Sequence, residues 1–182
     1  MNNIQLVENK VSVELLEKLN MIDLVAICEI AEVTMLDTYG FSIGSKKWHP
    51  PMVRDLEEYF IGVMLIRERK LIVGRIEKNI VGSLQLLCPH KLNKLSGFAV
   101  SIHDFFVVHM ARNSGIAEAM FGFAESYCRN HKYKLIKLSI RSDMAAAIAL
   151  VEKLGYKKWG VLDKFELVGN EIVSGYFYCK DL

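Results

Sequence analysis

The chain has 182 residues, of which 52% are hydrophobic and 24% charged, a balance that predicts a folded core and excludes an intrinsically disordered protein. A formal net charge of only +2 argues against a nucleic-acid-binding protein, and no apolar run reaches the length of a membrane span. The first residues also lack the apolar run of a signal peptide. We therefore expect a cytoplasmic protein that binds neither nucleic acid nor membrane, whose four scattered cysteines stay reduced and which holds no metal.

The first third of the chain is predicted to be mainly helical. Residues 4–7 form a short candidate strand, and periodic apolar residues predict helices over 13–20, 22–38 and 52–67. The segment 39–51 is broken by Gly and Pro and is predicted to be a loop.

After residue 68 the pattern changes to that of strands, with a hairpin signal at Glu77-Lys78-Asn79 and clear alternation over 134–141. Strands are predicted at 70–76, 80–87, 97–109, 134–141, 157–167 and 172–179. Two further helices are predicted, one beginning at Ile116 and one over 145–154 that ends at Gly155. This order indicates a single α/β domain over residues 1–182 with a mixed sheet. A Rossmann unit fits poorly, because the glycine turn follows three strands in hairpin order and no GxGxxG occurs.

A short turn, Arg112-Asn113-Ser114-Gly115-Ile116-Ala117, joins the third of these strands to the helix that follows. The helix shows an apolar stripe at Ile116, Ala119, Met120, Phe123, Ala124, Tyr127 and Cys128. Backbone N–H groups converge at such a helix start, and the helix dipole adds positive charge there. Small side chains let a ligand approach the backbone closely. The turn therefore predicts a phosphate-binding site.

These residues resemble a known family. Arg112-x-x-Gly115-x-Ala117 is similar to the Q/R-x-x-G-x-G/A motif of the GNAT family of N-acetyltransferases. Residues 102–107 resemble the family's fourth strand, 141–156 its motif B and 175–182 its last strand. The resemblance covers roughly residues 71–182.

The resemblance implies an α/β (α+β) fold with a mixed, mostly antiparallel sheet of about six to seven strands, splayed between strands four and five. It implies acetyl-CoA as co-substrate, with 1–68 as a helical acceptor-side part and 70–182 as the cofactor-binding core. The pantetheine arm is expected to lie along Phe105, Phe106, Val107 and Val108. The pyrophosphate is expected at Arg112, Asn113, Ser114, Gly115, Ile116 and Ala117.

The activity implied is direct transfer of acetyl to a primary amine of a small molecule or a protein, with the thioester carbonyl polarised by a backbone N–H near Val107. The family often places a glutamate base on strand four, and His103 stands at that position here. His103 is either this base or a residue that lines the cleft. By strand alternation, Ser101 is expected on the same face and Asp104 on the other.

Two departures keep a second function open. Val151 stands where many family members have the tyrosine that protonates the leaving thiolate, and Met144 replaces a common asparagine. Val151 cannot donate a proton, so the alternative is a non-catalytic acyl-CoA-binding or regulatory module on the same fold. The sequence leaves open whether the chain forms a homodimer.

Overall fold

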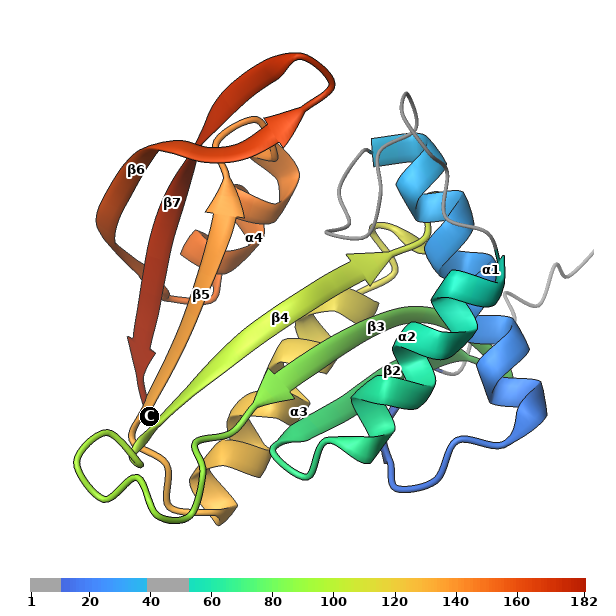
Figure 1. The fold of residues 1–182 in the computed structure, drawn as a ribbon, viewed down its shortest axis with the longest axis horizontal. Helices are drawn as coiled ribbons and strands as arrows, with labels where there is room; N and C mark the ends of the chain where they lie inside the picture. The colour runs from blue at the N-terminus through green and yellow to red at the C-terminus, as the bar shows by residue number, and fades with distance from the viewer. Residues whose placement is uncertain (1–10, 39–52) are drawn as a thin grey trace, which may run out of the picture.

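The structure, a computed structural model, describes residues 11–38 and 53–182. Its elements in chain order are β1 Val11–Leu16, α1 Met21–Thr38, α2 Val53–Leu65, β2 Arg69–Ile76, β3 Asn79–Leu87, β4 Ala99–Val107, the 3-10 turn η1 His109–Ala111, α3 Ile116–Asn130, β5 Leu135–Arg141, α4 Ala145–Lys153, β6 Lys157–Val168 and β7 Glu171–Asp181. The described strands form one sheet in the order β1-β2-β3-β4-β5-β7-β6 (Figure 1).

Neighbouring strands of this sheet are antiparallel except for the pair β4–β5, which is parallel. A mixed, mostly antiparallel sheet is therefore confirmed. β4 and β5 pair only where Ala99, Val100 and Ser101 face residues 135–137, and beyond that point the two strands diverge (Figure 1). This divergence is the splay that the family resemblance predicts.

Helices cover the sheet on both sides. We call the face under α1 and α2 the front face and the face under α3 and α4 the back face (Figure 1). Alternate residues of β2 divide between the two: Leu71 and Val73 pack with α1 and α2, whereas Ile72 packs with α3. Each face thus has its own apolar core. No helix within residues 11–38 and 53–182 is long and apolar enough to cross a membrane.

The prediction of a helix over residues 13–20 is wrong. Residues 11–16 form β1, which pairs with β2 in the register Val13↔Gly74, and their burial alternates with period two. β-Branched valines at 11 and 13 favour a strand, and the open edge of β2 supplies its partner. α1 begins later, after Asn20, whose side-chain oxygen accepts a hydrogen bond from the backbone N–H of Asp23 at 2.9 Å.

The other described elements follow the predicted pattern, with small shifts at their ends. The third predicted strand ends at Val107 rather than at residue 109, because residues 109–111 turn into η1. The helices at Met21–Thr38, Val53–Leu65 and Ala145–Lys153 are confirmed. The candidate strand at 4–7 and the loop predicted at 39–51 lie outside the described residues.

Candidate active site

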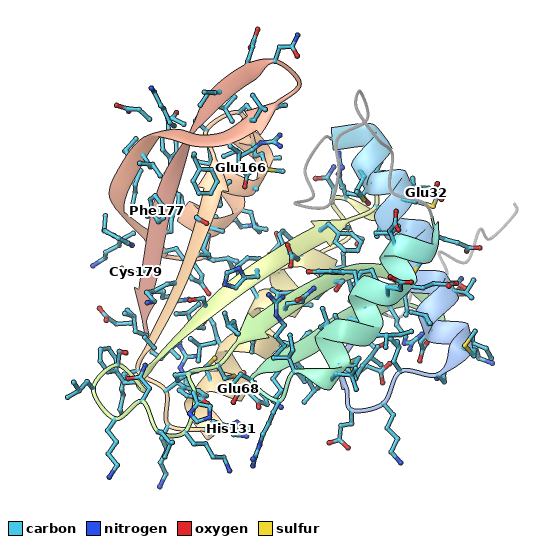
Figure 2. All side chains as sticks on the ribbon, viewed as in Figure 1. Glu32, Glu68, His131, Glu166, Phe177 and Cys179 are labelled. Carbon is cyan, nitrogen blue, oxygen red and sulfur yellow. The ribbon has the colours of Figure 1, made fainter. Side chains whose placement is uncertain are left out.

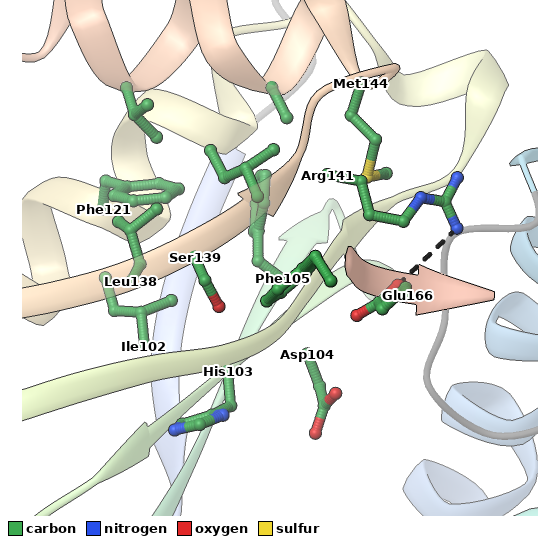
Figure 3. Close-up of a pocket in the computed structure, with 14 residues that line it drawn as sticks. Ile102, His103, Asp104, Phe105, Phe121, Leu138, Ser139, Arg141, Met144 and Glu166 are labelled. Carbon is green, nitrogen blue, oxygen red and sulfur yellow. Dashed lines mark ion pairs between the residues drawn. The ribbon is translucent and has the colours of Figure 1, made fainter. Parts of the chain in front are cut away.

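The splay between β4 and β5 opens into a cleft. It is lined by residues 102–105 of β4 and 138–141 of β5, by Val151 and its neighbours on α4, and by Phe165 and Glu166 of β6. Figure 3 shows His103, Ser139 and Glu166 among the side chains at this cleft. Backbone edges and polar side chains from four elements therefore meet at one place.

A β-bulge in β4 shapes one wall of the cleft. Ser83 of β3 faces Phe106 and Gln85 faces His103, so two residues of β4, Asp104 and Phe105, lie opposite one residue of β3. Asp104 has a φ of 47°, in the left-handed region that non-glycine residues seldom adopt. A bulge bends the strand and re-aims its side chains, and bulges occur often beside active sites.

The bulge corrects one expectation about this strand. Gln85 donates a hydrogen bond to the Tyr59 hydroxyl at 3.0 Å, so Gln85 and its cross-strand partner His103 lie on the front face. Asp104 accepts a hydrogen bond from the same Tyr59 hydroxyl, which comes from α2. His103 and Asp104 therefore share a face, although strand alternation predicts opposite faces.

Asp104 is held by a network that reaches across three elements. Arg69 of β2 lies 2.6 Å from the Gln85 side-chain oxygen and 3.7 Å from the Asp104 carboxylate. Burial and the hydrogen bond to Asp104 raise the pKa of Tyr59 far above its ordinary value. The hydroxyl therefore remains a proton donor to Asp104 throughout the neutral range.

His103 stands at the cleft with its imidazole partly open to solvent. Desolvation lowers the pKa of this ring below the ordinary 6.5, with a further contribution from Arg69, while the Asp104 carboxylate opposes the shift. The imidazole is consequently neutral at pH 7. A neutral imidazole can accept a proton, which is what the predicted base must do.

Glu166 and Arg141 form a second charged group at the cleft, which the sequence analysis missed. The Arg141 side chain is only 6% exposed and binds both carboxylate oxygens of Asp143, at 3.0 and 3.1 Å. Its Nη1 also lies 3.9 Å from Glu166 (Figure 3). Burial raises the pKa of Glu166; Arg141 opposes this shift, and Asp143 and Asp104 add to it.

The predicted phosphate turn has the geometry of an anion site. Gly115 caps α3 with a φ of 81°, and Asn113 is also left-handed at 62°. The Ser114 hydroxyl donates to the Ala111 carbonyl at 2.7 Å, which fixes the turn. The same hydroxyl accepts a long hydrogen bond from the Ile116 backbone N–H at 3.4 Å, and residues 112–115 are exposed. An exposed backbone turn at the start of a helix suits a phosphate.

The strand that precedes this turn runs along the cleft. Val108 donates its N–H to Val81 of β3 at 3.0 Å, so the N–H of Val107, one residue earlier, points to the other side of β4. β5 no longer pairs with β4 beyond Ser101, so on that side the strand borders the cleft. Phe105 packs edge-on against Phe121 of α3, with ring centroids 5.0 Å apart. An extended chain can therefore lie along this strand edge.

The motif B departures also lie at the cleft. Val151 is 1% exposed and forms part of the back-face core, and Met144 lies close to it on the lining. Ser139 of β5 is the hydroxyl-bearing side chain among the described residues that line the cleft. A tyrosine at 151 would have to displace this packing.

Buried thiols, and side chains of the types that bind metals, occur in the part of the chain that the structure describes. Its four cysteines are free, and burial raises the pKa of Cys28 to about 11 and that of Cys128 to about 12. A thiol with such a pKa is a poor nucleophile at pH 7. Within residues 11–38 and 53–182, no group of three or more His, Cys, Asp or Glu side chains is arranged to hold a metal ion.

Comparison with known proteins gives a consistent result. The family model described as "Acetyltransferase (GNAT) family" matches residues 27–156. An uncharacterized N-acetyltransferase of Azospirillum brasilense is 31% identical over 132 residues, which are 72% of this chain and 76% of the relative.

Solved structures share the fold. An N-acetyltransferase from Staphylococcus aureus Mu50 has a TM-score of 0.74 at 16% identity, covering 94% of this chain and 98% of that one. A Salmonella typhimurium protein assigned as an acetyltransferase, solved with its cofactor acetyl-CoA, has a TM-score of 0.73 at 14% identity, covering 95% and 94%. At these identities the likeness is one of fold alone.

Proposed function

This chain belongs to the acetyltransferase (GNAT) family, and on that basis we propose that it transfers acetyl from acetyl-CoA directly to a primary amine. The observation that carries the proposal is the path of the chain from the cleft to the turn at residues 112–117. One strand, β4, connects the anion-binding turn at the start of α3 with His103 and Asp104 at the bulge. A donor bound along β4 would place its reactive end beside these two side chains.

In this proposal the donor is held mainly by backbone groups. The backbone turn at residues 112–117 binds the pyrophosphate, and the edge at residues 105–108 pairs with the pantetheine arm. Small side chains at Ser114, Gly115 and Ala117 allow the close approach. The bound group supplies a thioester as the activated acyl donor.

The acceptor amine must lose a proton before or during attack, since most amines are protonated at pH 7. His103, neutral because its pKa is lowered, accepts this proton. The N–H of Val107 points away from β3 and donates to the oxygen of the thioester carbonyl as charge develops there. Because both substrates are held in one cleft, much of the rate enhancement comes from their positioning.

The thiolate leaves without help from position 151, because valine has no proton to give. A thiol has an ordinary pKa of about 8.5, so its thiolate is a tolerable leaving group in water. In this proposal residues 70–182 hold the donor, and the acceptor enters the cleft beside His103. The same absence of a hydroxyl at Val151 is the observation that favours the second candidate, a module that binds acyl-CoA without catalysis.

Two measurements on the purified chain separate these functions. Acetyl-CoA is expected to raise the Tm, since a ligand at 100 times its Kd stabilises the folded state by about 2.7 kcal/mol. Release of free CoA thiol with a panel of small amines and short peptides then reports transfer. No shift with either acetyl-CoA or CoA contradicts both functions. A shift without amine-dependent thiol release leaves the binding module.

A further inference from the structure

Half of the front face of the sheet carries no helix from the described part of the chain (Figure 1). α1 and α2 lie in front of β2, β3 and β4, and among the described helices none lies in front of β5, β7 and β6 (Figure 1). Lys137 and Ser139 of β5 are exposed there. In the register of β5 and β7, Lys137 faces Cys179 and Ser139 faces Phe177, so these side chains share the front face.

Three aromatic rings cross this open surface. The ring centroids of Phe165 and Phe177 lie 5.8 Å apart, and those of Phe177 and Trp159 lie 5.5 Å apart. Phe165 also lines the cleft, whereas Trp159 is 62% exposed. Figure 2 shows Phe177 and Glu166 on the β6–β7 half of the sheet, across from α1 and α2. We call these three residues the aromatic strip; it leads from the cleft to the edge of the sheet.

Irregular backbone in β6 puts two of the rings in place. The register with β7 shifts between Lys158 and Gly160, so Trp159 is an extra residue at a bulge. A second shift of the β6–β7 register, between Leu162 and Glu166, includes Phe165 among the irregular residues of β6. Bulges of this kind re-aim side chains next to active sites.

A glycine completes the strip. A Cβ added to Gly175 of β7 would lie 2.2 Å from Cγ of Phe165, so the ring occupies the space that any other residue would fill. The back face of the β6–β7 strand pair belongs to the apolar core. There Tyr178 is fully buried, and its hydroxyl donates a hydrogen bond to Glu152 of α4 at 2.8 Å. The core therefore does not need the front rings. Two half-buried rings that continue into an exposed one form an apolar surface of the kind that indicates a binding site.

Resting on the proposed function, we infer that the acceptor is the N-terminal segment of a polypeptide, with its α-amine beside His103 and an apolar side chain among its first residues on the aromatic strip. The reach of the strip supports a chain rather than a small amine. From β4 to β6 there are three strand spacings, at least about 14 Å because β4 and β5 diverge beyond Ser101, which an extended peptide of about five residues covers.

The chemistry at both ends supports the same acceptor. An α-amine has an ordinary pKa of about 7.7–8.0 against about 10.4 for a lysine side chain, so it is the amine that a weak base such as His103 can deprotonate at pH 7. Exposed Lys137 and Lys157 lie on the front face beside the strip and favour an acidic residue in the same segment.

The test uses two synthetic hexapeptide amides with a free α-amine and one aspartate, identical except for phenylalanine or glycine at the second position. CoA release by the full chain is expected to be roughly tenfold to a hundredfold more efficient, as kcat/KM, with the phenylalanine peptide. W159A should reduce this preference to within about threefold while leaving the Tm shift with acetyl-CoA unchanged. V161A is the matched control: Val161 is 56% exposed on the same strand, but it faces Tyr176 on the back side.

Equal rates for the two peptides, or a preference that survives W159A, would overturn the inference. Acetylation of small amines with no activity on either peptide would overturn it as well and would leave the proposed function standing. Failure of acetyl-CoA to raise the Tm removes the proposed function, and the inference with it.

Discussion

The Tyr59 hydroxyl of α2 donates a hydrogen bond to the carboxylate of Asp104 at the bulge of β4. This contact ties α2 to the strand that borders the cleft. Gln85 and Arg69 support it from β3 and β2. Asp104 is largely buried, so the carboxylate depends on these donors for its stability in the folded state.

Replacing Tyr59 with phenylalanine removes the donor and keeps the ring. We expect Tyr59→Phe to lower the free energy of unfolding by about 1–3 kcal/mol, because a buried carboxylate then lacks a hydrogen-bond partner. Urea denaturation measures the change. Tyr176→Phe is the control, since that hydroxyl makes no hydrogen bond within residues 11–38 and 53–182 and its ring contact with Lys158 survives. Equal stabilities of the two variants would contradict the role of Tyr59.

The turn at Gly115 gives a test of cofactor binding. Gly115 has a φ of 81° and open space around its missing Cβ, so Gly115→Ala costs about 1 kcal/mol of backbone strain without a steric clash in the chain itself. The added methyl group stands where a pyrophosphate must approach the backbone. We expect acetyl-CoA affinity to fall at least tenfold in calorimetric titration. Gly169→Ala carries similar strain, at a φ of 64° in the β6–β7 turn, and should leave acetyl-CoA affinity unchanged.

Gly74 of β2 lies directly beneath the start of α3. A Cβ there would come within 2.7 Å of Ile116 Cγ1 and 2.9 Å of Met120 Sδ. Gly74→Ala should therefore destabilise the fold by about 1–3 kcal/mol through overpacking. Gly122→Ala, in the same helix with nothing within 4 Å, should instead stabilise it by about 0.5–1 kcal/mol. Thermal unfolding of the two variants measures opposite shifts in Tm; shifts of the same sign would contradict this account of the packing.

Elements whose patterns are local could be predicted from the sequence. β5 alternates clearly, β2 and β3 are short apolar runs joined by a hairpin signal, and the apolar stripe of α3 together with Gly115 marks where this helix begins. Residues 11–16 fit both a helical and a strand period, and only the neighbouring edge of β2 decides between them. Local propensity carries no information about such a partner.

The parts of the site that could not be predicted depend on backbone irregularity. Alternation places Asp104 on the wrong face because it assumes a regular strand, and the bulge at this residue breaks that assumption. Glu166 reaches the cleft only because the register of β6 shifts before it. A single sequence contains no reliable signal for where a strand gains an extra residue. The positions of both carboxylates are therefore set by tertiary structure.

His103 gives the last prediction, on pH dependence. Desolvation lowers the pKa of its imidazole, and Arg69 of β2 lowers it further, whereas the Asp104 carboxylate raises it. Glu166 and Arg141 also line this cleft. The base-competent neutral ring therefore persists below the ordinary pKa of 6.5, and the acid limb of the pH–rate profile should have its midpoint below 6.5.

The His103→Asn variant should lose about 10²–10⁴-fold in kcat at pH 7 and lose this acid limb. The lowered pKa of His103 also affects stability. At pH values between 6.5 and the lowered pKa, the unfolded chain binds a proton that the folded chain does not. The wild type therefore loses stability as the pH falls through this window, whereas His103→Asn does not show that loss. His90→Asn, outside the cleft, is the control for both profiles. An unchanged rate in His103→Asn would show that the ring only lines the cleft, whereas a lost acid limb with an intact Tm shift from acetyl-CoA would identify it as the base.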